Sequence, residues 1–330
     1  MSRRKIGVII HRLRRPNVIR PEDIERLKTL GDVVITDKDG PLTDEEAIEI
    51  LRDCEIALGS WGTPKPNEAI MAGCPKLTLW VHAAGTVKGH FGAHLAGRDM
   101  KIATCKGAIA DNVAQAAVAE VVLGLRRILP SAVANWSAVT GPPANVLVMS
   151  DATVGIVGAS DVGRRAIELL KANHCREILV YDPYLADDEA ARLGVTKVSD
   201  LVDLCARSDA VTLHTPAIPA CAKMLAAAHF QAMPDDGVFV NTARGMCIDE
   251  GALLAELSKG RLFAFLDVSD PEPAAEDSPL RALPNVVYSS HITGGPGTNV
   301  GRQAVDDIAA FLEGRAPTCV VTEDMLDRLA

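Results

Sequence analysis

Short apolar runs alternate with amphipathic segments along nearly the whole chain, and this alternation constrains the fold more than any other feature. The first series begins with KIGVIIH (residues 5–11) and continues to MKIATC (100–105). A second series begins with TVGIVG (153–158) and ends with NVVYSS (285–290). Strands that alternate with helices in this way form parallel sheets with helices on both faces. We therefore predict an α/β protein with two doubly wound parallel sheets.

The length of the chain also favours two domains, because 330 residues exceed what one hydrophobic core usually serves. The last helical pattern, TNVGRQAVDDIAAFLEG (298–314), follows the glycine-rich stretch GGPG. We expect this helix to return the chain to the first domain, so that the second domain is an insertion. The predicted boundaries are 1–106 with 296–330 for the first domain and 107–295 for the second.

Several helix ends can be located from capping signals. Pro21 suits a first helical position, Thr43 and Glu46 form a capping box, and Gly31 can end the first helix. The longest helical pattern, residues 111–129, ends before Pro130 and is predicted to bridge the domains. After it, Trp136 lies among helix breakers, either in a surface loop or in an arm that packs on a second subunit.

Composition narrows the class of partner. The formal net charge of -9 disfavours nucleic acid and anionic membranes, so a small molecule is the expected ligand. Eight cysteines are scattered without a C-x-x-C pair, which predicts neither structural zinc nor a disulfide framework. The apolar part of the N-terminus is too short for a signal peptide, and we expect no stretch of about 20 apolar residues that spans a bilayer. A cytoplasmic protein without a metal site is the prediction.

The stretch VGIVGASDVGRRAIELL (154–170) reads as a strand, a glycine turn and a helix. A dinucleotide fingerprint has G-x-G-x-x-G in such a turn, and here the three positions hold Gly158, Ser160 and Gly163. Ser160 adds bulk where close approach is needed, although its hydroxyl can donate to a phosphate. Asp161 suits a helix start but repels a pyrophosphate. The turn alone leaves open whether it binds a cofactor or is a turn without a ligand.

Asp182 supports the cofactor interpretation. It lies 19 residues after Gly163, at the end of the next predicted strand. At that position a carboxylate can accept hydrogen bonds from the ribose hydroxyls of NAD and would repel the additional phosphate of NADP. We therefore predict that NAD is the cofactor.

Four later segments at predicted strand ends carry a family resemblance: VTLHTPAIP, VFVNTARGMCIDEGAL, FLDVSDPEP and NVVYSSHITGG. With them the chain closely resembles the D-isomer-specific 2-hydroxyacid dehydrogenases, from about Lys76 to Pro317 and most strongly from Asn241 to Gly295. The resemblance implies a flavodoxin-like substrate domain and an inserted Rossmann NAD-binding domain. It also implies three catalytic residues, Arg244, Glu272 and His291.

The chemistry of a 2-oxo acid suits these residue types. A guanidinium such as that of Arg244 can hold the substrate carboxylate bidentately and polarise the carbonyl. An imidazole such as that of His291 can give a proton to the oxygen that hydride transfer leaves charged, and can take it back in the reverse direction. Glu272, bonded to the far ring nitrogen, would orient the imidazole and favour its protonated form.

The remaining predicted site residues also follow from the resemblance. Asp267 matches an aspartate at the nicotinamide carboxamide, and the segment from His214 to Pro216 matches a turn that lines the cofactor. The complete predicted cofactor set is Gly158, Ser160, Asp161, Val162, Gly163, Asp182, His214, Thr215, Pro216, Thr242, Ala243, Arg244, Asp267, His291 and Gly294.

The first domain is predicted to hold the substrate. HAAGTVKGH (82–90) aligns with a family loop whose backbone amides bind the substrate carboxylate, which places Ala84, Gly85 and Thr86 there, beside Arg244 and His291 of the second domain. Lys88 either contacts a second acidic group of the substrate or is a solvated surface lysine. Trp61 either covers the cleft or packs in the core.

The sequence thus predicts an NAD-dependent oxidoreductase that transfers a hydride between nicotinamide and a small 2-oxo or 2-hydroxy acid of the D series, bound between the domains. Glyoxylate, hydroxypyruvate and phosphoglycerate-like compounds are the expected substrates. The resemblance also suggests a homodimer. The alternative is a non-enzymatic NAD-sensing protein, like the transcriptional corepressors that share the fold.

Overall fold

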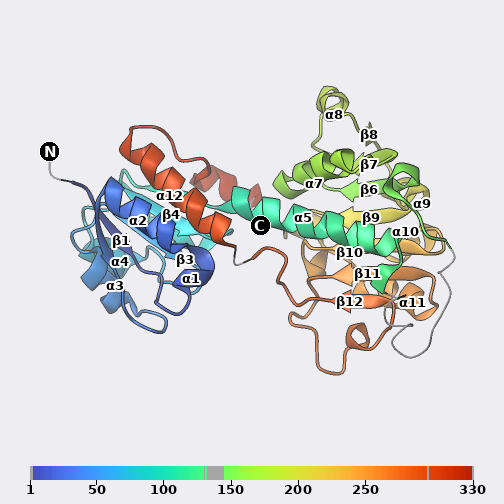
Figure 1. The fold of residues 1–330 in the computed structure, drawn as a ribbon, viewed down its shortest axis with the longest axis horizontal. Helices are drawn as coiled ribbons and strands as arrows, with labels where there is room; N and C mark the ends of the chain where they lie inside the picture. Colours follow the sequence, from blue (N-terminus) through green and yellow to red (C-terminus); the bar gives the residue numbers. More distant parts are fainter. Residues whose placement is uncertain (1–2, 130, 132–144, 296, 329–330) are drawn as a thin grey trace. The chain divides into compact units, whose positions relative to one another are not determined.

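The computed structural model describes residues 3–129, 131, 145–295 and 297–328 of the chain. These residues divide into two compact units, one within Met1–Ile109 and Gly295–Leu329 and the other within Ala110–Gly294. Each unit has its own sheet (Figure 1). Each also has its own hydrophobic core. The segment around Trp136 lies outside the described residues.

The sheet of the first unit has the strand order β13-β5-β4-β3-β1-β2. Its strands are β1 (Lys5–Val8), β2 (Asp32–Ile35), β3 (Ile56–Ser60), β4 (Leu79–Ala83), β5 (Lys101–Thr104) and β13 (Val320–Val321). The first five are parallel in the order 2-1-3-4-5, which is the flavodoxin-like order, and the predicted fold class is confirmed. The sequence did not reveal β13, which pairs antiparallel with β5 at the edge.

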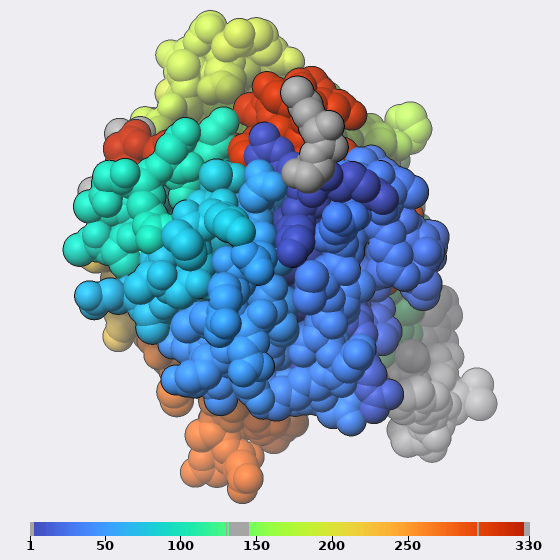
Figure 2. All heavy atoms as spheres, turned by 90° about the vertical axis from the view of Figure 1, so that its left-hand side faces the viewer, coloured from blue at the N-terminus to red at the C-terminus, as the bar shows by residue number. Residues whose placement is uncertain are grey.

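Helices cover both faces of this sheet. They are α1 (Arg15–Val18), α2 (Pro21–Leu30), α3 (Asp44–Leu51), α4 (Glu68–Gly73) and α12 (Thr298–Leu312). Pro21 is the first residue of α2, Gly31 ends that helix, and the Thr43–Glu46 capping box at the start of α3 is present, as predicted. In Figure 1 α12, in orange-red, lies beside the blue helices α1 and α2, and it packs against α1, α2 and β4. Figure 2 shows red residues next to blue residues on the surface of the molecule.

The close packing of α12 depends on a glycine. A Cβ atom on Gly301 would lie 2.3 Å from the carbonyl oxygen of Val18, so the two backbones are in direct contact. Buried residues of α12, including Val305 and Ile308, join one face of the sheet in a single core cluster. This packing ties the C-terminal helix to the first unit.

The second unit contains a seven-stranded sheet in the order β12-β11-β10-β9-β6-β7-β8. The strands are β6 (Thr153–Val157), β7 (Glu177–Tyr181), β8 (Thr196–Lys197), β9 (Ala210–Leu213), β10 (Gly237–Asn241), β11 (Leu262–Leu266) and β12 (Val286–Tyr288). All neighbouring strands are parallel. Counted from β6 the order is the Rossmann order with a seventh strand, and the chain reverses direction across the sheet between β6 and β9.

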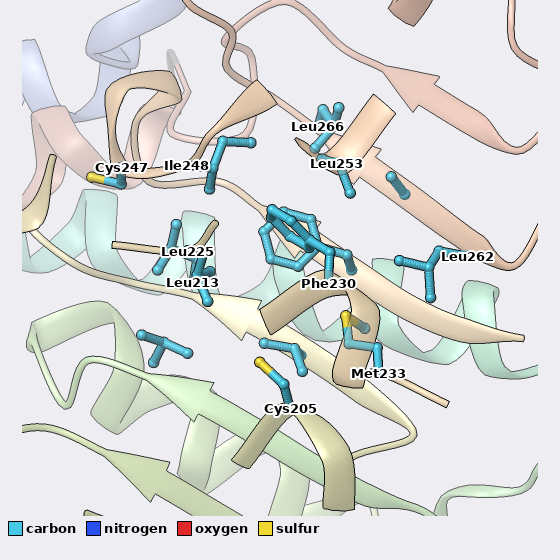
Figure 3. Packing of buried hydrophobic residues seen from close by; sticks show 14 of the residues in the cluster. Cys205, Leu213, Leu225, Phe230, Met233, Cys247, Ile248, Leu253, Leu262 and Leu266 are labelled. Carbon is cyan, nitrogen blue, oxygen red and sulfur yellow. The ribbon is translucent and has the colours of Figure 1, made fainter. Parts of the chain in front are cut away.

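The helices of the second unit are α7 (Asp161–Ala172), α8 (Asp187–Leu193), α9 (Leu201–Arg207), α10 (Ala227–Ala232) and α11 (Glu250–Ser258), with the greater part of α5 (Lys106–Leu125). One face of the sheet packs around Phe230 of α10, with aliphatic and sulfur-containing neighbours (Figure 3). The ring of Phe230 meets that of Phe239 edge-on at 5.2 Å between centroids. This cluster supports the strands whose carboxyl ends carry the candidate site.

Helix α5 continues from the first unit into the second, as the predicted bridging helix does. It is also long and apolar enough to cross a membrane, so the expectation that the chain lacks such a stretch is wrong. Half of this stretch is buried inside the protein. Ala117, Val121 and Leu125 pack in the core of the second unit, which explains why a core helix is so apolar.

Candidate active site

The glycine turn has the geometry of a phosphate-binding turn. Gly158 follows β6 with φ of 98°, a conformation that favours glycine, and α7 begins three residues later at Asp161. A Cβ atom on Gly163 would lie 2.0 Å from the carbonyl oxygen of Gly158, so only glycine allows helix and strand to approach this closely. Ser160 has φ of −65°, which a serine adopts without strain. The backbone N–H groups at the start of α7 can therefore face an anion.

Ser160 joins the two loops at the switch point of the sheet. Its hydroxyl donates to the carbonyl oxygen of His214, which follows β9, at 2.7 Å. The hydroxyl oxygen of Ser160 also accepts from the N–H of Gly163 at 3.4 Å and caps α7. Because the hydroxyl hydrogen is used in the bond to His214, it is not available in this arrangement for a phosphate. Val162 and Asp161 lie in the first turn of α7, with Asp161 exposed.

Asp182 lies beside this turn, at the end of β7. One of its carboxylate oxygens accepts from the N–H of Ala159 at 2.7 Å, and the other accepts from the N–H of Tyr184 at 2.8 Å. A carboxylate oxygen has room for a second donor. The side chain is therefore fixed where ribose hydroxyls would reach it if a pyrophosphate occupied the turn.

Buried polar atoms without partners also lie at this edge of the sheet. Nδ1 of His214 and Oγ1 of Thr242 are both inaccessible and have no hydrogen bond to any residue that the structure describes, whereas Nε2 of His214 bonds to Oγ1 of Thr212 at 3.1 Å. Burial lowers the pKa of His214 to about 4, so its ring is neutral near pH 7. Thr215 and Pro216 continue the same loop. Unsatisfied polar atoms beside a glycine turn fit a dinucleotide, which would supply both partners and apolar cover.

The three predicted catalytic residues follow three neighbouring strands. Arg244 follows β10, Glu272 follows β11 and His291 follows β12, so all three lie at the carboxyl edge of the sheet. A hydrogen bond joins Nδ1 of His291 to Oε1 of Glu272. The imidazole is 46 % exposed and its Nε2 atom is left for a substrate. The structure thus brings His291 and Glu272 together as predicted.

The segment around Arg244 is held by its own strand end and by a close backbone contact. Asn241 accepts from the N–H of Ala243 at 3.0 Å and donates to the carbonyl oxygen of Arg244 at 3.2 Å. A Cβ atom on Gly245 would lie 2.1 Å from the carbonyl oxygen of Ser269. The loop that carries Arg244 therefore touches the loop that leads to Glu272. One guanidinium nitrogen donates to Ala243, and other N–H groups remain for a ligand.

Asp267 is buried at the end of β11 and holds the loop that carries His291. Its Oδ1 atom accepts from Oγ of Ser289 at 2.6 Å and from the N–H of Ile292 at 2.8 Å. Its Oδ2 atom accepts from the N–H and the hydroxyl of Thr293. Burial acts to raise the pKa of Asp267, but these hydrogen bonds lower it, so the carboxylate stays ionised.

All four lone-pair positions of this carboxylate are used by the 289–293 loop. This geometry favours a positioning role for Asp267, and its predicted contact with the nicotinamide carboxamide stays a prediction. Gly294, also predicted at the cofactor, directly follows the loop.

The predicted carboxylate loop belongs to the first unit and follows β4. The carbonyl oxygens of Ala84 and Gly85 lie 3.1 and 2.8 Å from the hydroxyl oxygen of Thr104 and share its single hydrogen. Within the described part of the chain, the N–H groups of Gly85 and Thr86 have no acceptor. Lys88 is exposed. The loop therefore offers two free amides, as a carboxylate site requires.

Sequence reasoning missed Glu120, the one charged residue between Asp111 and Arg126 of the apolar helix α5. Its Oε2 atom is buried without a hydrogen-bond partner. Burial, with a contribution from the charge of Asp267, raises its pKa to about 7. A single acidic residue in an otherwise apolar helix was the available signal.

Comparison with known proteins agrees with this geometry. Residues 129–293 match the model of the D-isomer specific 2-hydroxyacid dehydrogenase, NAD binding domain. The chain is 31% identical over 297 residues to D-3-phosphoglycerate dehydrogenase of Methanocaldococcus jannaschii, which covers 87% of the chain and 54% of that protein. The chain therefore spans about half the length of this curated relative.

Two further proteins match over most of their length. Glyoxylate/hydroxypyruvate reductase B of Citrobacter koseri is 31% identical, over 83% of this chain and 86% of the relative. The fold of apo D-mandelate dehydrogenase from Rhodotorula graminis superposes with a TM-score of 0.79 at 20% identity, over 98% of each chain. The relatives are named as dehydrogenases and reductases, which favours the enzymatic interpretation over the non-enzymatic alternative.

The prediction of an NAD-binding domain is confirmed by the family model, and the predicted family by both sequence relatives. The chain belongs to the family of D-isomer-specific 2-hydroxyacid dehydrogenases.

Proposed function

We propose that this protein is an NAD-dependent oxidoreductase that interconverts a small 2-oxo acid and the corresponding D-2-hydroxy acid. The observation that carries the proposal is the hydrogen bond between His291 and Glu272, made at the edge of the sheet where Arg244 also lies. A histidine fixed through Nδ1 by a carboxylate presents Nε2 for proton transfer. This arrangement suits the reduction of a carbonyl group.

Each of the three residues has a distinct role in this proposal. NAD supplies or accepts the hydride when it is bound. Arg244 binds the substrate carboxylate and polarises the carbonyl through its N–H donors. His291 gives the proton that the carbonyl oxygen needs in the reductive direction and removes it in the oxidative direction. Glu272 bonds to Nδ1 of the imidazole and sets its orientation.

The two units have different roles in the proposed reaction. We propose residues 1–106 with 296–330 as the substrate domain and residues 107–295 as the NAD-binding domain. The free amides of Gly85 and Thr86 support the first assignment. The glycine turn and the position of Asp182 support the second, and a carboxylate at Asp182 disfavours the additional phosphate of NADP.

Glyoxylate, hydroxypyruvate and phosphoglycerate-like acids are the proposed substrate range, since relatives are named for such compounds. A screen of purified protein with 2-oxo acids, NADH and NADPH tests the proposal through NADH oxidation at 340 nm. We expect turnover of at least one of these acids with preference for NADH. Binding of NADH without turnover of any 2-oxo acid would instead favour the sensing role.

We further propose that the protein is a cytoplasmic homodimer that binds neither nucleic acid nor membranes. The negative net charge supports the exclusion of polyanionic partners. Buried cysteines such as Cys54, Cys74 and Cys105 are free thiols, as is usual in a reducing compartment. Light scattering after size exclusion tests the dimer.

A further inference from the structure

The loop that follows β1 carries three arginines with different environments. Arg12 pairs with Asp39, and Arg15 donates to the carbonyl oxygen of Thr36 at 2.8 Å. Among the residues that the structure describes, the guanidinium of Arg14 has no carboxylate partner and donates to no hydrogen-bond acceptor, whereas its backbone N–H donates to the carbonyl oxygen of His11 at 3.1 Å. Its guanidinium carbon lies 5.8 Å from the centre of the Trp61 ring. Arg14 is therefore held against an aromatic face with its charge uncompensated.

Two polar atoms of this loop are buried and unsatisfied. Nε of Arg14 and Nδ1 of His11 are both inaccessible and have no hydrogen-bond partner in the described part of the chain. An unsatisfied buried donor costs about 1–3 kcal/mol, so native proteins usually supply it with a partner. The half-buried guanidinium of Arg14 also has terminal N–H groups free for a ligand. The free terminal N–H groups of the guanidinium therefore indicate a place for an acceptor that the described residues do not provide.

The position of Arg14 relates it to the predicted carboxylate loop. The strands β4, β3 and β1 are neighbours in that order and parallel, so the loops after them lie at one edge of the sheet. Trp61 follows β3 and packs on the same core cluster as Ile109. The Cδ1 atom of Ile109 lies 3.6 Å from where a Cβ atom on Gly85 would be. Because β3 lies between β1 and β4, the loop that carries Trp61 lies between the loop of Arg14 and the carboxylate loop at this edge of the sheet.

We propose that Arg14, supported by Trp61, binds a second anionic group of the substrate, a carboxylate or a phosphate, while the loop from Ala84 to Thr86 binds the first carboxylate. The substrate class is thus a 2-oxo or 2-hydroxy acid with a second acidic group. This inference rests on the proposed function and adds a determinant of specificity to it. The planar guanidinium matches both anions bidentately, and the aromatic face restricts its orientation. Lys88, exposed on a flexible stem, is the alternative determinant.

The test compares substrates of one and two acidic groups. kcat/KM is measured with NADH for glyoxylate and pyruvate, and for 2-oxoglutarate, oxaloacetate and 3-phosphohydroxypyruvate. The variants are Arg14→Gln, Arg14→Lys, Lys88→Gln and the matched control Arg12→Gln, whose arginine belongs to the same loop but pairs with Asp39. The dicarboxylates and the phosphorylated acid distinguish the two kinds of second anion.

We expect the wild type to prefer at least one doubly acidic substrate. Arg14→Gln should lower its kcat/KM for that substrate about 10- to 100-fold, mainly through KM, and change the singly acidic substrates less than about twofold, as fits the loss of one charged hydrogen-bonding group. The kcat/KM of Arg14→Lys for the doubly acidic substrate should lie between those of the wild type and Arg14→Gln. The kcat/KM of Arg12→Gln should match that of the wild type. Equal effects of Arg14→Gln on both classes, or an effect of Lys88→Gln alone, would overturn the inference.

Calorimetry measures the binding of 2-oxoglutarate and of 2-oxobutyrate to the same proteins. These measurements test the anion site at Arg14 separately from the proposed enzymatic function. Tighter binding of the dianion that disappears in Arg14→Gln supports the anion site even if no 2-oxo acid is turned over, in which case the proposed function fails alone. Unchanged dianion binding in a folded Arg14→Gln variant, with an unaltered thermal midpoint, removes the anion site and leaves the proposed function intact.

Discussion

Thr293 donates twice to one oxygen of Asp267, through its backbone N–H at 3.1 Å and through its hydroxyl. Ser289 and Ile292 satisfy the other oxygen. Between these anchors, Ser290 and His291 both have positive φ, of 55° and 62°, which non-glycine residues seldom adopt. The buried carboxylate therefore holds a strained segment, and with it the histidine that the proposed reaction uses.

This relationship predicts the behaviour of Asp267→Asn. An amide cannot accept from all four donors, so the variant should lose about 1–3 kcal/mol of stability and release the 289–293 loop. We expect kcat to fall at least about tenfold while the Kd for NADH, measured by calorimetry, changes little. The control Ser289→Ala removes one donor only and should cost about 1 kcal/mol. Weaker NADH binding with an unchanged kcat would instead support a contact between Asp267 and the nicotinamide.

Gly163→Ala tests the close approach of helix α7 to the glycine turn. The added methyl group would meet the carbonyl oxygen of Gly158 at 2.0 Å, so helix or turn must move. We expect a loss of about 1–3 kcal/mol of stability, as for other overpacked sites, and weaker NADH binding. The matched control is Gly251→Ala in helix α11, where the new atom makes only an ordinary contact at 3.5 Å. If Gly163→Ala binds NADH as the wild type does, the turn is not the cofactor site.

Ser160→Gly tests the substituted position of the fingerprint. Removing the side chain allows closer approach of a pyrophosphate to the backbone, so we expect NADH to bind more tightly. The variant also loses the bond to His214 and should be destabilised by about 1 kcal/mol. The control Ser160→Ala loses the same hydroxyl but keeps Cβ, and should show the destabilisation without the gain in affinity. Calorimetric titration of the wild type and the two variants with NADH measures these affinities. Equal affinities for NADH would mean that Ser160 does not hinder its binding.

Two buried histidines of the first unit predict acid sensitivity. Burial lowers the pKa of His82 to about 3 and that of His90 to about 4, from an ordinary 6.5. Because the unfolded chain binds these protons first, stability is complete above pH 6.5 and falls as the pH drops toward 4. Near pH 5 the two groups contribute a slope of up to about 2.7 kcal/mol per pH unit.

Urea unfolding at several pH values, followed by tryptophan fluorescence, measures this dependence. His90→Phe, which keeps a ring against Trp80, should lower the slope by up to about 1.4 kcal/mol per pH unit, the contribution of one titrating group. An unchanged slope in this variant would show that His90 is not buried in its neutral form.

Local patterns predicted much of the fold and of the site. The Thr43–Glu46 capping box, the starts of α2 and α7, and the glycine turn depend on residues close in sequence, and they were found there. The alternation of apolar and amphipathic segments, which is also a local pattern, predicted both parallel sheets. The strand β13 was not predicted because it has only two residues and forms by pairing with β5, which is distant in the sequence.

Other features depend on segments far apart in the chain. The saturation of Asp267 requires a loop 22 to 26 residues away, and the burial of Glu120 requires the sheet against which α5 packs. The contact of Arg14 with Trp61 joins the loops of two strands. Sequence patterns showed where these side chains lie along the chain, but not which partners they meet.

The most direct test of the account is His291→Asn, measured for 2-oxo acid reduction and for NADH binding in parallel. Asparagine can keep a hydrogen bond to Glu272 but cannot deliver a proton. Since a positioned acid–base group contributes about 10²- to 10⁴-fold, we expect kcat to fall by that factor while the Kd for NADH stays within about threefold. Turnover at the wild-type rate in this variant would contradict the central claim that His291 is the proton donor.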